Sequence, residues 1–213
     1  MAEPDALQIL YASFGYLPSL GGGEIQLHGV ARRLRERGHA PRVVCQRTRP
    51  VDDWVGNATV TSDSFAETEI EGVPVTRLGF ARGRRRAMAP WVSLYRGYGR
   101  GAAFASRRLS GLFARDLARA AGEPQVVHAV RIGQEFLARA AHSLARARGV
   151  PFVLTRLRHP PGPNPLHRAY DALARESDAV VAMTRYERDV LIREVGVDAT
   201  KIHVFGVAPV LAD

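Results

Sequence analysis

The chain has 213 residues, 46% of them hydrophobic, which suits one sizeable folded domain and argues against an unfolded chain. The single Cys45 excludes an internal disulfide, no apolar run reaches the roughly 18–20 residues of a membrane span, and no secretory signal opens the sequence, so we expect a cytoplasmic protein. The net charge of +9 rests on 30 basic residues, all Arg except Lys201, a bias typical of GC-rich genomes, and by itself it does not indicate a nucleic-acid partner.

Alternating strand and helix patterns along the chain predict an α/β fold, a Rossmann-like parallel sheet flanked by helices. We expect strands at residues 7–13, 42–46, 125–129, 152–155, 178–183 and 201–205. We expect helices at residues 22–37, 93–121, 133–148, 164–177 and 184–195. Residues 67–70 and 73–78 flank Glu71-Gly72, which predicts a small hairpin or two short edge strands. Gly38 should end the first helix, and Thr184 to Glu187 form a capping box that opens the last one.

A glycine turn, Gly21, Gly22 and Gly23 followed by Glu24, lies between the first expected strand and helix. Glycines there let a phosphate approach the backbone, and the free amides and dipole at a helix N-terminus favour an anion. The same residues could form a tight turn without a ligand. Their spacing is neither that of a dinucleotide-binding loop nor that of a phosphate-binding Walker loop.

Several short segments follow one another in a recognisable order. They are the segment from Pro18 to Glu24, Arg37-Gly38-His39, Val126-Val127-His128-Ala129, Val150 to Thr155, Asp178 to Thr184 with Glu187 and Arg188, Lys201 to Val204, and Gly206-Val207. Together they resemble the N-terminal half of the family-four retaining glycosyltransferases, which have the two-domain GT-B fold. The resemblance covers almost the whole chain.

This resemblance implies that residues 1–213 form the single acceptor-side domain of such an enzyme. The family's nucleotide-sugar half carries two glutamates eight positions apart, and no Glu in this sequence has a Glu eight residues later. We therefore expect the donor half to be absent and the isolated chain to be inactive. An expressed domain, a truncated protein and one subunit of a split enzyme would all fit.

For the site, the resemblance implies retaining transfer from a nucleotide sugar to a sugar, lipid or small-molecule acceptor, with no metal ion and no other cofactor. Gly21, Gly22 and Gly23 would bind the donor diphosphate, and Glu24 would orient that loop. The missing half would act in cis or as a separate subunit.

Histidines are the other candidate catalytic residues. The resemblance implies that His159, which follows the strand at 152–155, contacts the reacting sugar or the acceptor. A neutral His could orient the acceptor hydroxyl or accept its proton near pH 7. The alternative is a surface His in a proline-rich loop. His128, Thr155 and Arg158 are expected to line the acceptor cleft, although His128 could instead be a hydrogen-bonded core residue.

Residues 72–115 contain ten Arg and no Asp or Glu. Arg84, Arg85, Arg86 and Trp91 combine basic and aromatic side chains, as suits the anionic inner face of a membrane. Binding of an anionic acceptor and a plain solvated loop are the alternatives.

Two function classes compete with glycosyl transfer. A non-catalytic binding or interaction module would keep the fold without the chemistry. A nucleic-acid-binding protein would explain the net charge, but we do not expect a nucleic-acid partner.

Overall fold

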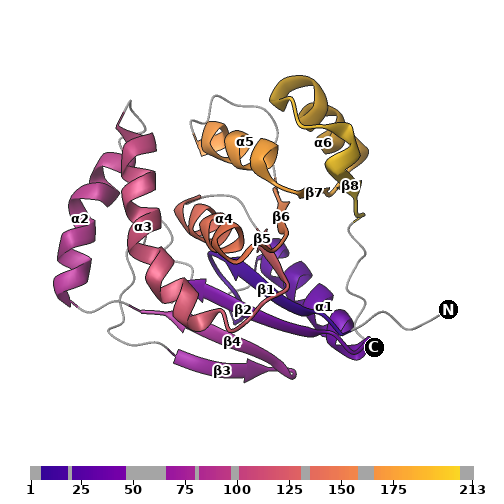
Figure 1. Cartoon of the computed structure of the whole chain (residues 1–213), viewed down its shortest axis with the longest axis horizontal. Helices are drawn as coiled ribbons and strands as arrows, with labels where there is room; N and C mark the ends of the chain where they lie inside the picture. Colours follow the sequence, from indigo (N-terminus) through magenta and orange to yellow (C-terminus); the bar gives the residue numbers. More distant parts are fainter. Residues whose placement is uncertain are drawn as a thin grey trace.

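We describe the protein from a computed structural model that covers residues 6–18, 21–46, 66–79, 82–96, 101–130, 135–157 and 166–206. For residues 82, 84, 85, 96 and 166–169 it describes the backbone alone. Figure 1 shows one sheet with helices packed around it. No helix within the described ranges is both long enough and apolar enough to cross a membrane.

The sheet has eight strands in the order β3-β4-β2-β1-β5-β6-β7-β8. Their bounds are β1 Gln8–Ser13, β2 Ala40–Gln46, β3 Ala66–Ile70, β4 Val73–Leu78, β5 Val126–Val130, β6 Phe152–Thr155, β7 Ala179–Ala182 and β8 Ile202–Val204. Neighbouring strands are parallel except for β3, which pairs antiparallel with β4 and forms the edge. The predicted α/β fold with a mainly parallel sheet is confirmed, and the hairpin at Glu71-Gly72 joins the sheet through β4.

Helices connect the strands. They are α1 Gly22–Glu36, α2 Arg82–Arg96, α3 Ala102–Ala120, α4 Phe136–Arg148, α5 Leu166–Glu176 and α6 Arg185–Val190. A π-helical turn, Leu191–Val195, extends α6, and a 3-10 turn, Ala199–Lys201, leads into β8. α2 lies outside α3, on the far side of the molecule from α5 and α6 (Figure 1).

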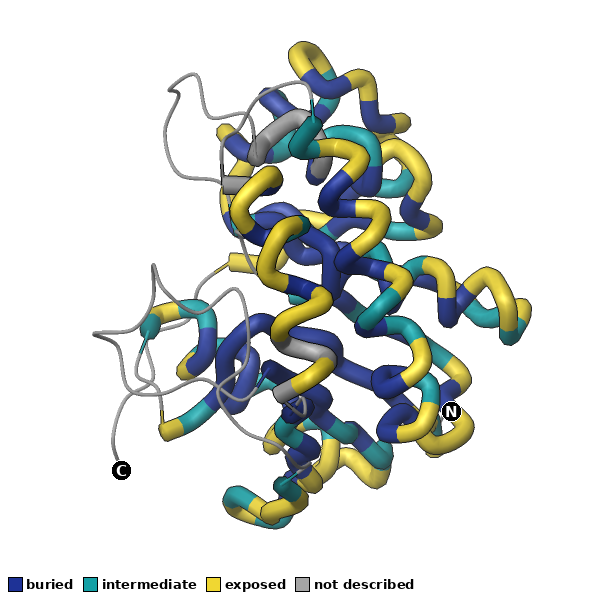
Figure 2. The backbone as a smooth tube through the Cα atoms, turned by 90° about the vertical axis from the view of Figure 1, so that its left-hand side faces the viewer, coloured by how far each residue is buried: buried dark blue, intermediate teal, exposed yellow. Residues whose placement is uncertain are grey.

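The two faces of the sheet are both buried, as expected for strands with crossover helices. Leu10 and Ala12 of β1 face the larger core cluster, which includes residues of α3, α4 and α5. Ile9 and Tyr11, the alternating residues of the same strand, face a smaller cluster with Leu27 of α1. Figure 2 shows these buried strands inside and exposed residues on the outer faces of the helices.

Helix ends agree with the sequence signals in two places. Gly38 follows α1 with φ of 83°, a left-handed conformation that favours glycine. The side chain of Thr184 accepts a hydrogen bond of 3.0 Å from the amide of Glu187, as the capping box predicts. The Glu187 carboxylate accepts a hydrogen bond of 2.8 Å from the amide of Met183.

The single helix predicted for residues 93–121 is wrong. The segment belongs to two helices, and α2 already begins at Arg82, so the solvated-loop alternative for the Arg-rich stretch is wrong within residues 82–96. Arginine has a high helix propensity, which the charge pattern concealed. Gly101 is the N-cap of α3. Gly101 lies against Leu94, and a β-carbon on it would be 2.6 Å from that side chain.

Candidate functional site

The order of the strands marks one position at the carboxyl edge of the sheet. From β1 the chain moves outward through β2 and β4, and later from β5 outward to β8 on the other side. The carboxyl ends of β1 and β5 therefore flank the point where the direction reverses. In open α/β sheets, ligands bind in the crevice at this point.

The glycine turn enters this position from β1. Gly21 is the N-cap of α1 in an extended conformation, and its carbonyl accepts the first helical hydrogen bond, from the amide of Ile25 at 3.1 Å. The carboxylate of Glu24, 2% exposed, folds back over Gly21: a β-carbon there would lie 2.4 Å from Glu24 Oε2. The Glu24 side chain is thus close to Gly21, and its role in orienting the loop stays a prediction.

The other two glycines differ in their surroundings. A β-carbon on Gly22 would meet no atom within 4 Å among the described residues, and Gly22 is exposed. A β-carbon on Gly23 would lie 2.8 Å from Cδ1 of Leu157, which follows β6. The glycine turn is therefore in contact with the segment after β6 and open at Gly22.

His128 and Thr155 are brought together at the ends of β5 and β6. His128 Nε2 lies 2.7 Å from Thr155 Oγ1 across the two strands, and the imidazole packs on the Tyr11 ring with centroids 5.0 Å apart. Burial lowers the pKa of His128 to about 4, so the ring is neutral at pH 7. The predicted partners Arg158 and His159 lie outside the described residues.

Three buried glutamates lie at the starts of helices on the carboxyl edge of the sheet, and the sequence had pointed to only two of them. Glu24 and Glu187 were noted at α1 and α6, but Glu135, 2% exposed at the start of α4, was not. Its carboxylate accepts a hydrogen bond from the hydroxyl of Tyr95 in α2. Negative side chains near helix N-termini are favourable because of the helix dipole.

A buried ion pair next to Thr155 was also missed. Arg156 is 2% exposed, and its guanidinium pairs with Asp171 of α5. Its partner lies 15 residues away in another element, so no local pattern could have identified it.

The basic and aromatic surface is built differently from the prediction. Trp91 is only partly exposed and packs edge-on against Phe104, with ring centroids 5.6 Å apart. The Arg108 guanidinium lies 5.1 Å from the Phe104 ring centroid. The exposed apolar groups are Phe104 and Leu94, each 42% exposed. Arg86 is exposed, whereas the structure describes only the backbone of Arg84 and Arg85.

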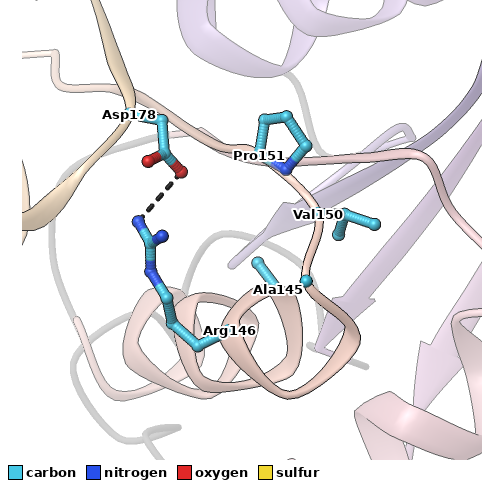
Figure 3. Close-up of a pocket in the computed structure, with 6 residues that line it drawn as sticks. Ala145, Arg146, Val150, Pro151 and Asp178 are labelled. Carbon is cyan, nitrogen blue, oxygen red and sulfur yellow. Dashed lines mark hydrogen bonds and ion pairs between the residues drawn. The ribbon is translucent and has the colours of Figure 1, made fainter.

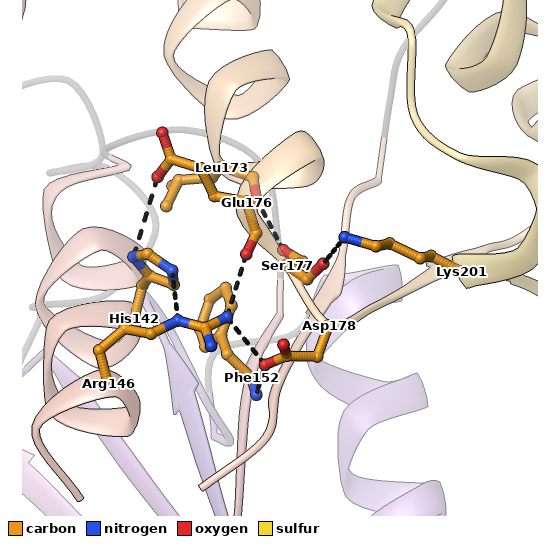
Figure 4. A network of polar contacts seen from close by, with 8 residues as sticks. All are labelled: His142, Arg146, Phe152, Leu173, Glu176, Ser177, Asp178 and Lys201. Carbon is orange, nitrogen blue, oxygen red and sulfur yellow. Dashed lines mark hydrogen bonds and ion pairs between the residues drawn. The ribbon is translucent and has the colours of Figure 1, made fainter. Parts of the chain in front are cut away.

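A cavity of about 370 Å³ lies at the opposite edge of the sheet (Figure 3). Val150 and Pro151 precede β6, and Asp178 precedes β7, so the cavity is at the amino ends of these strands. Figure 4 shows the adjoining network, in which Arg146 bonds to Asp178 at 2.9 Å and to the carbonyl of Glu176 at 3.1 Å. Since these charges already satisfy each other, we assign the network a structural role. Across the described ranges, no group of three or more His, Cys, Asp or Glu could hold a metal ion.

The chain was compared with protein families and with solved structures. Residues 21–208 match the family described as "Glycosyl transferase 4-like domain". No curated protein sequence matches the chain.

Among solved structures, Anabaena HepE in complex with UDP-glucose superposes with a TM-score of 0.59 at 15% identity, covering 94% of this chain and 43% of HepE. A glycosyltransferase from Rickettsia africae superposes with a TM-score of 0.55 at 16% identity, covering 95% of this chain and 43% of that protein. A UDP-N-acetylglucosamine 2-epimerase from Rickettsia bellii superposes with a TM-score of 0.54 at 12% identity, covering 94% of this chain and 45% of the epimerase. At these identities the likeness is one of fold alone, and this chain spans less than half of each of these structures.

Proposed function

The chain belongs to the glycosyl transferase 4-like domain family and has the fold of the N-terminal half of a GT-B glycosyltransferase, and from this premise we propose that it is the acceptor-side domain of an enzyme that transfers a sugar from a nucleotide sugar. The observation that carries the proposal is the glycine turn at the start of α1, which follows β1 at the reversal point of the sheet and contacts the segment after β6 through Gly23 and Leu157.

In the proposed reaction the bond between the anomeric carbon and the donor phosphate breaks, and the acceptor oxygen bonds to that carbon with retention of configuration. The nucleoside diphosphate leaves with its negative charge. The amides of Gly22 and Gly23 at the start of α1 stabilise it, because they are fixed dipoles aimed at the developing charge. Gly21 contributes less, since the Glu24 carboxylate covers it.

The acceptor lies on the β5–β6 side in this proposal. His128 is neutral and already bonded to Thr155, so it shapes the cleft and positions sugar hydroxyls rather than carrying a proton. His159 orients the acceptor hydroxyl or accepts its proton, and Arg158 lines the same cleft. UDP-glucose bound to HepE supports a uridine diphosphate sugar as the first donor to examine.

The test is a transfer assay of this chain joined to a donor-binding domain, with a panel of sugar nucleotides and acceptors. We expect transfer from one donor, and a loss of about 100-fold in Gly22→Val, whose side chain occupies the space of the diphosphate. Gly29→Val is the control, because Gly29 lies in the same helix and a β-carbon on it also meets no atom within 4 Å. Binding of sugar without transfer by the joined protein would favour the non-catalytic module.

For the surface of Leu94, Phe104, Arg107 and Arg108, we propose peripheral contact with an anionic membrane. Two exposed apolar side chains can enter the interface while the arginines meet head groups. Co-sedimentation with anionic vesicles should exceed that with neutral vesicles by about tenfold and fall in Leu94→Ser/Phe104→Ser. Salt-sensitive binding to DNA or RNA without binding to vesicles would instead indicate a nucleic-acid partner.

A further inference from the structure

The residues that follow β1, up to Leu17, are attached to the rest of the fold by one buried and one partly buried polar contact. Tyr16, 1% exposed, places its hydroxyl 2.7 Å from Nδ1 of His28 in α1. The carbonyl of the next residue, Leu17, accepts a hydrogen bond from the guanidinium of Arg77 in β4. Both contacts span many residues and end on elements outside the loop.

His28 also contacts the turn of the β3–β4 hairpin. Its Nε2 lies 3.2 Å from Oε2 of Glu71, which Arg32 approaches at 3.3 Å. The neighbouring His28 and Arg32 side chains lower the pKa of the Glu71 carboxyl, so it is ionised at neutral pH. His28 therefore lies between two polar groups, with Nε2 facing this carboxylate and Nδ1 hydrogen-bonded to the Tyr16 hydroxyl.

We propose that Tyr16, His28, Glu71 and Arg77 are positioning residues that hold the path of the β1–α1 loop, and through it the amides of Gly22 and Gly23. One imidazole, 8% exposed, ties the loop to α1 and α1 to the hairpin. The hairpin thereby contributes to a site that none of its own residues touches. This inference rests on the proposed function only for what the loop binds, and not for how the loop is held.

Two backbone amides report the position of the loop directly. The amide of Gln46 donates to the carbonyl of Phe14 at 3.2 Å. The amide of Ile25 donates to the carbonyl of Gly21 at 3.1 Å. The amide of Gln125 donates to Gln8 at 2.8 Å, at the other end of β1, and serves as the internal reference.

Hydrogen exchange of the full chain, measured at single amides, tests the anchoring. In Tyr16→Phe and in His28→Gln, exchange at Gln46 and Ile25 should be about fivefold faster, the factor of one lost hydrogen bond, with Gln125 unchanged. Glu36→Gln is the matched control, because Glu36 pairs with Arg32 at 3.5 Å on the same helix. Unchanged exchange at Gln46 and Ile25, or an equal rise at all three amides, would overturn the proposal.

Transfer activity separates this inference from the proposed function. With the chain joined to a donor-binding domain, Tyr16→Phe should lower kcat/KM for the sugar nucleotide about tenfold, and Glu36→Gln should leave it unchanged. If the unmodified protein transfers no sugar, the proposed function fails, and the exchange measurement still decides the anchoring. Full activity of Tyr16→Phe despite faster loop exchange would overturn the positioning role.

Discussion

Gly22 and Gly23 are neighbours in sequence with opposite surroundings, so alanine at each should have different effects. Alanine at Gly22 meets open space and gains helix propensity, whereas alanine at Gly23 must displace Leu157. We expect Gly23→Ala to be less stable than Gly22→Ala by about 1 kcal/mol in urea unfolding. In a Leu157→Ala background this difference should vanish. Equal stabilities in both backgrounds would contradict the contact.

The protonation of His128 gives a second prediction at this scale. Burial lowers its pKa from 6.5 to about 4. Between these values the unfolded chain binds a proton at His128 that the folded chain does not, so stability falls as the pH drops through this window. The loss by pH 4 is on the order of 3 kcal/mol.

Urea unfolding of the wild type and of His128→Gln at pH 7, 5.5 and 4 measures this effect. The other histidines contribute equally to both proteins, so only the difference between the two curves matters. We expect the wild type to lose more stability than the variant toward pH 4. Parallel curves would show that His128 is not buried as a neutral ring.

These residues show what a sequence can predict of the site. Gly22, His128 and Thr155 were identified because a strand-to-helix turn and two strand ends are visible in the pattern. The hydrogen bond between His128 and Thr155 was not, since it depends on β5 and β6 being neighbours in a register that pairs His128 with Val153. The contact of Tyr16 with His28 was missed because it depends on how the residues after β1 fold back against α1.

At the scale of elements, α4 is attached to the amino ends of β6 and β7 by the Asp178 carboxylate. It accepts from the amide of Phe152 at 2.8 Å and from Arg146 at 2.9 Å (Figure 4). Partial burial alone would raise the pKa of Asp178, but these hydrogen bonds outweigh it and lower the pKa. Its contribution to stability is therefore present above an unfolded-state pKa of about 3.9 and is lost as the pH falls through the lower folded value.

We expect Asp178→Ala to destabilise the fold by about 1–2 kcal/mol at pH 7, since it leaves the Phe152 amide without its acceptor. Asp178→Asn keeps an oxygen there and should cost about half as much. Asp189→Asn is the control, because Asp189 makes only an exposed pair with Arg188 at 3.5 Å. Thermal or urea unfolding distinguishes them, and equal effects of the three changes would refute the assignment.

Elements with strong local signals were predicted closely, and those decided by tertiary packing were not. β6 has the predicted bounds, and α1 ends next to Gly38 as the glycine signal indicated. Most of α2 was not predicted, because Pro90 and the arginines before it show no helical repeat of apolar residues. Packing of α2 on α3, with Met88 and Val92 buried, sustains a helix there that the local pattern does not show.

At the scale of the whole molecule, the strand order decides where the candidate site lies. The fold class followed from the alternation of strands and helices, but the strand order, which fixes the reversal point between β1 and β5, required long-range pairing. Only that order makes β1, β5 and β6 neighbours. In the proposed function, a site at this edge of one sheet is only the acceptor-side part of the enzyme's full site.

This geometry predicts weak nucleotide binding by the chain alone. A few amides at the start of α1 contribute on the order of 0.3–1 kcal/mol each toward an anion in water, and the Glu24 carboxylate opposes it. We expect a Kd for UDP of about 1 mM or weaker by calorimetry, and a micromolar Kd once the chain is joined to a donor-binding domain. Gly22→Val should weaken binding in the joined protein. Micromolar binding of UDP by the 213-residue chain would show instead that its own residues complete the donor site, and the acceptor-side assignment would then be wrong.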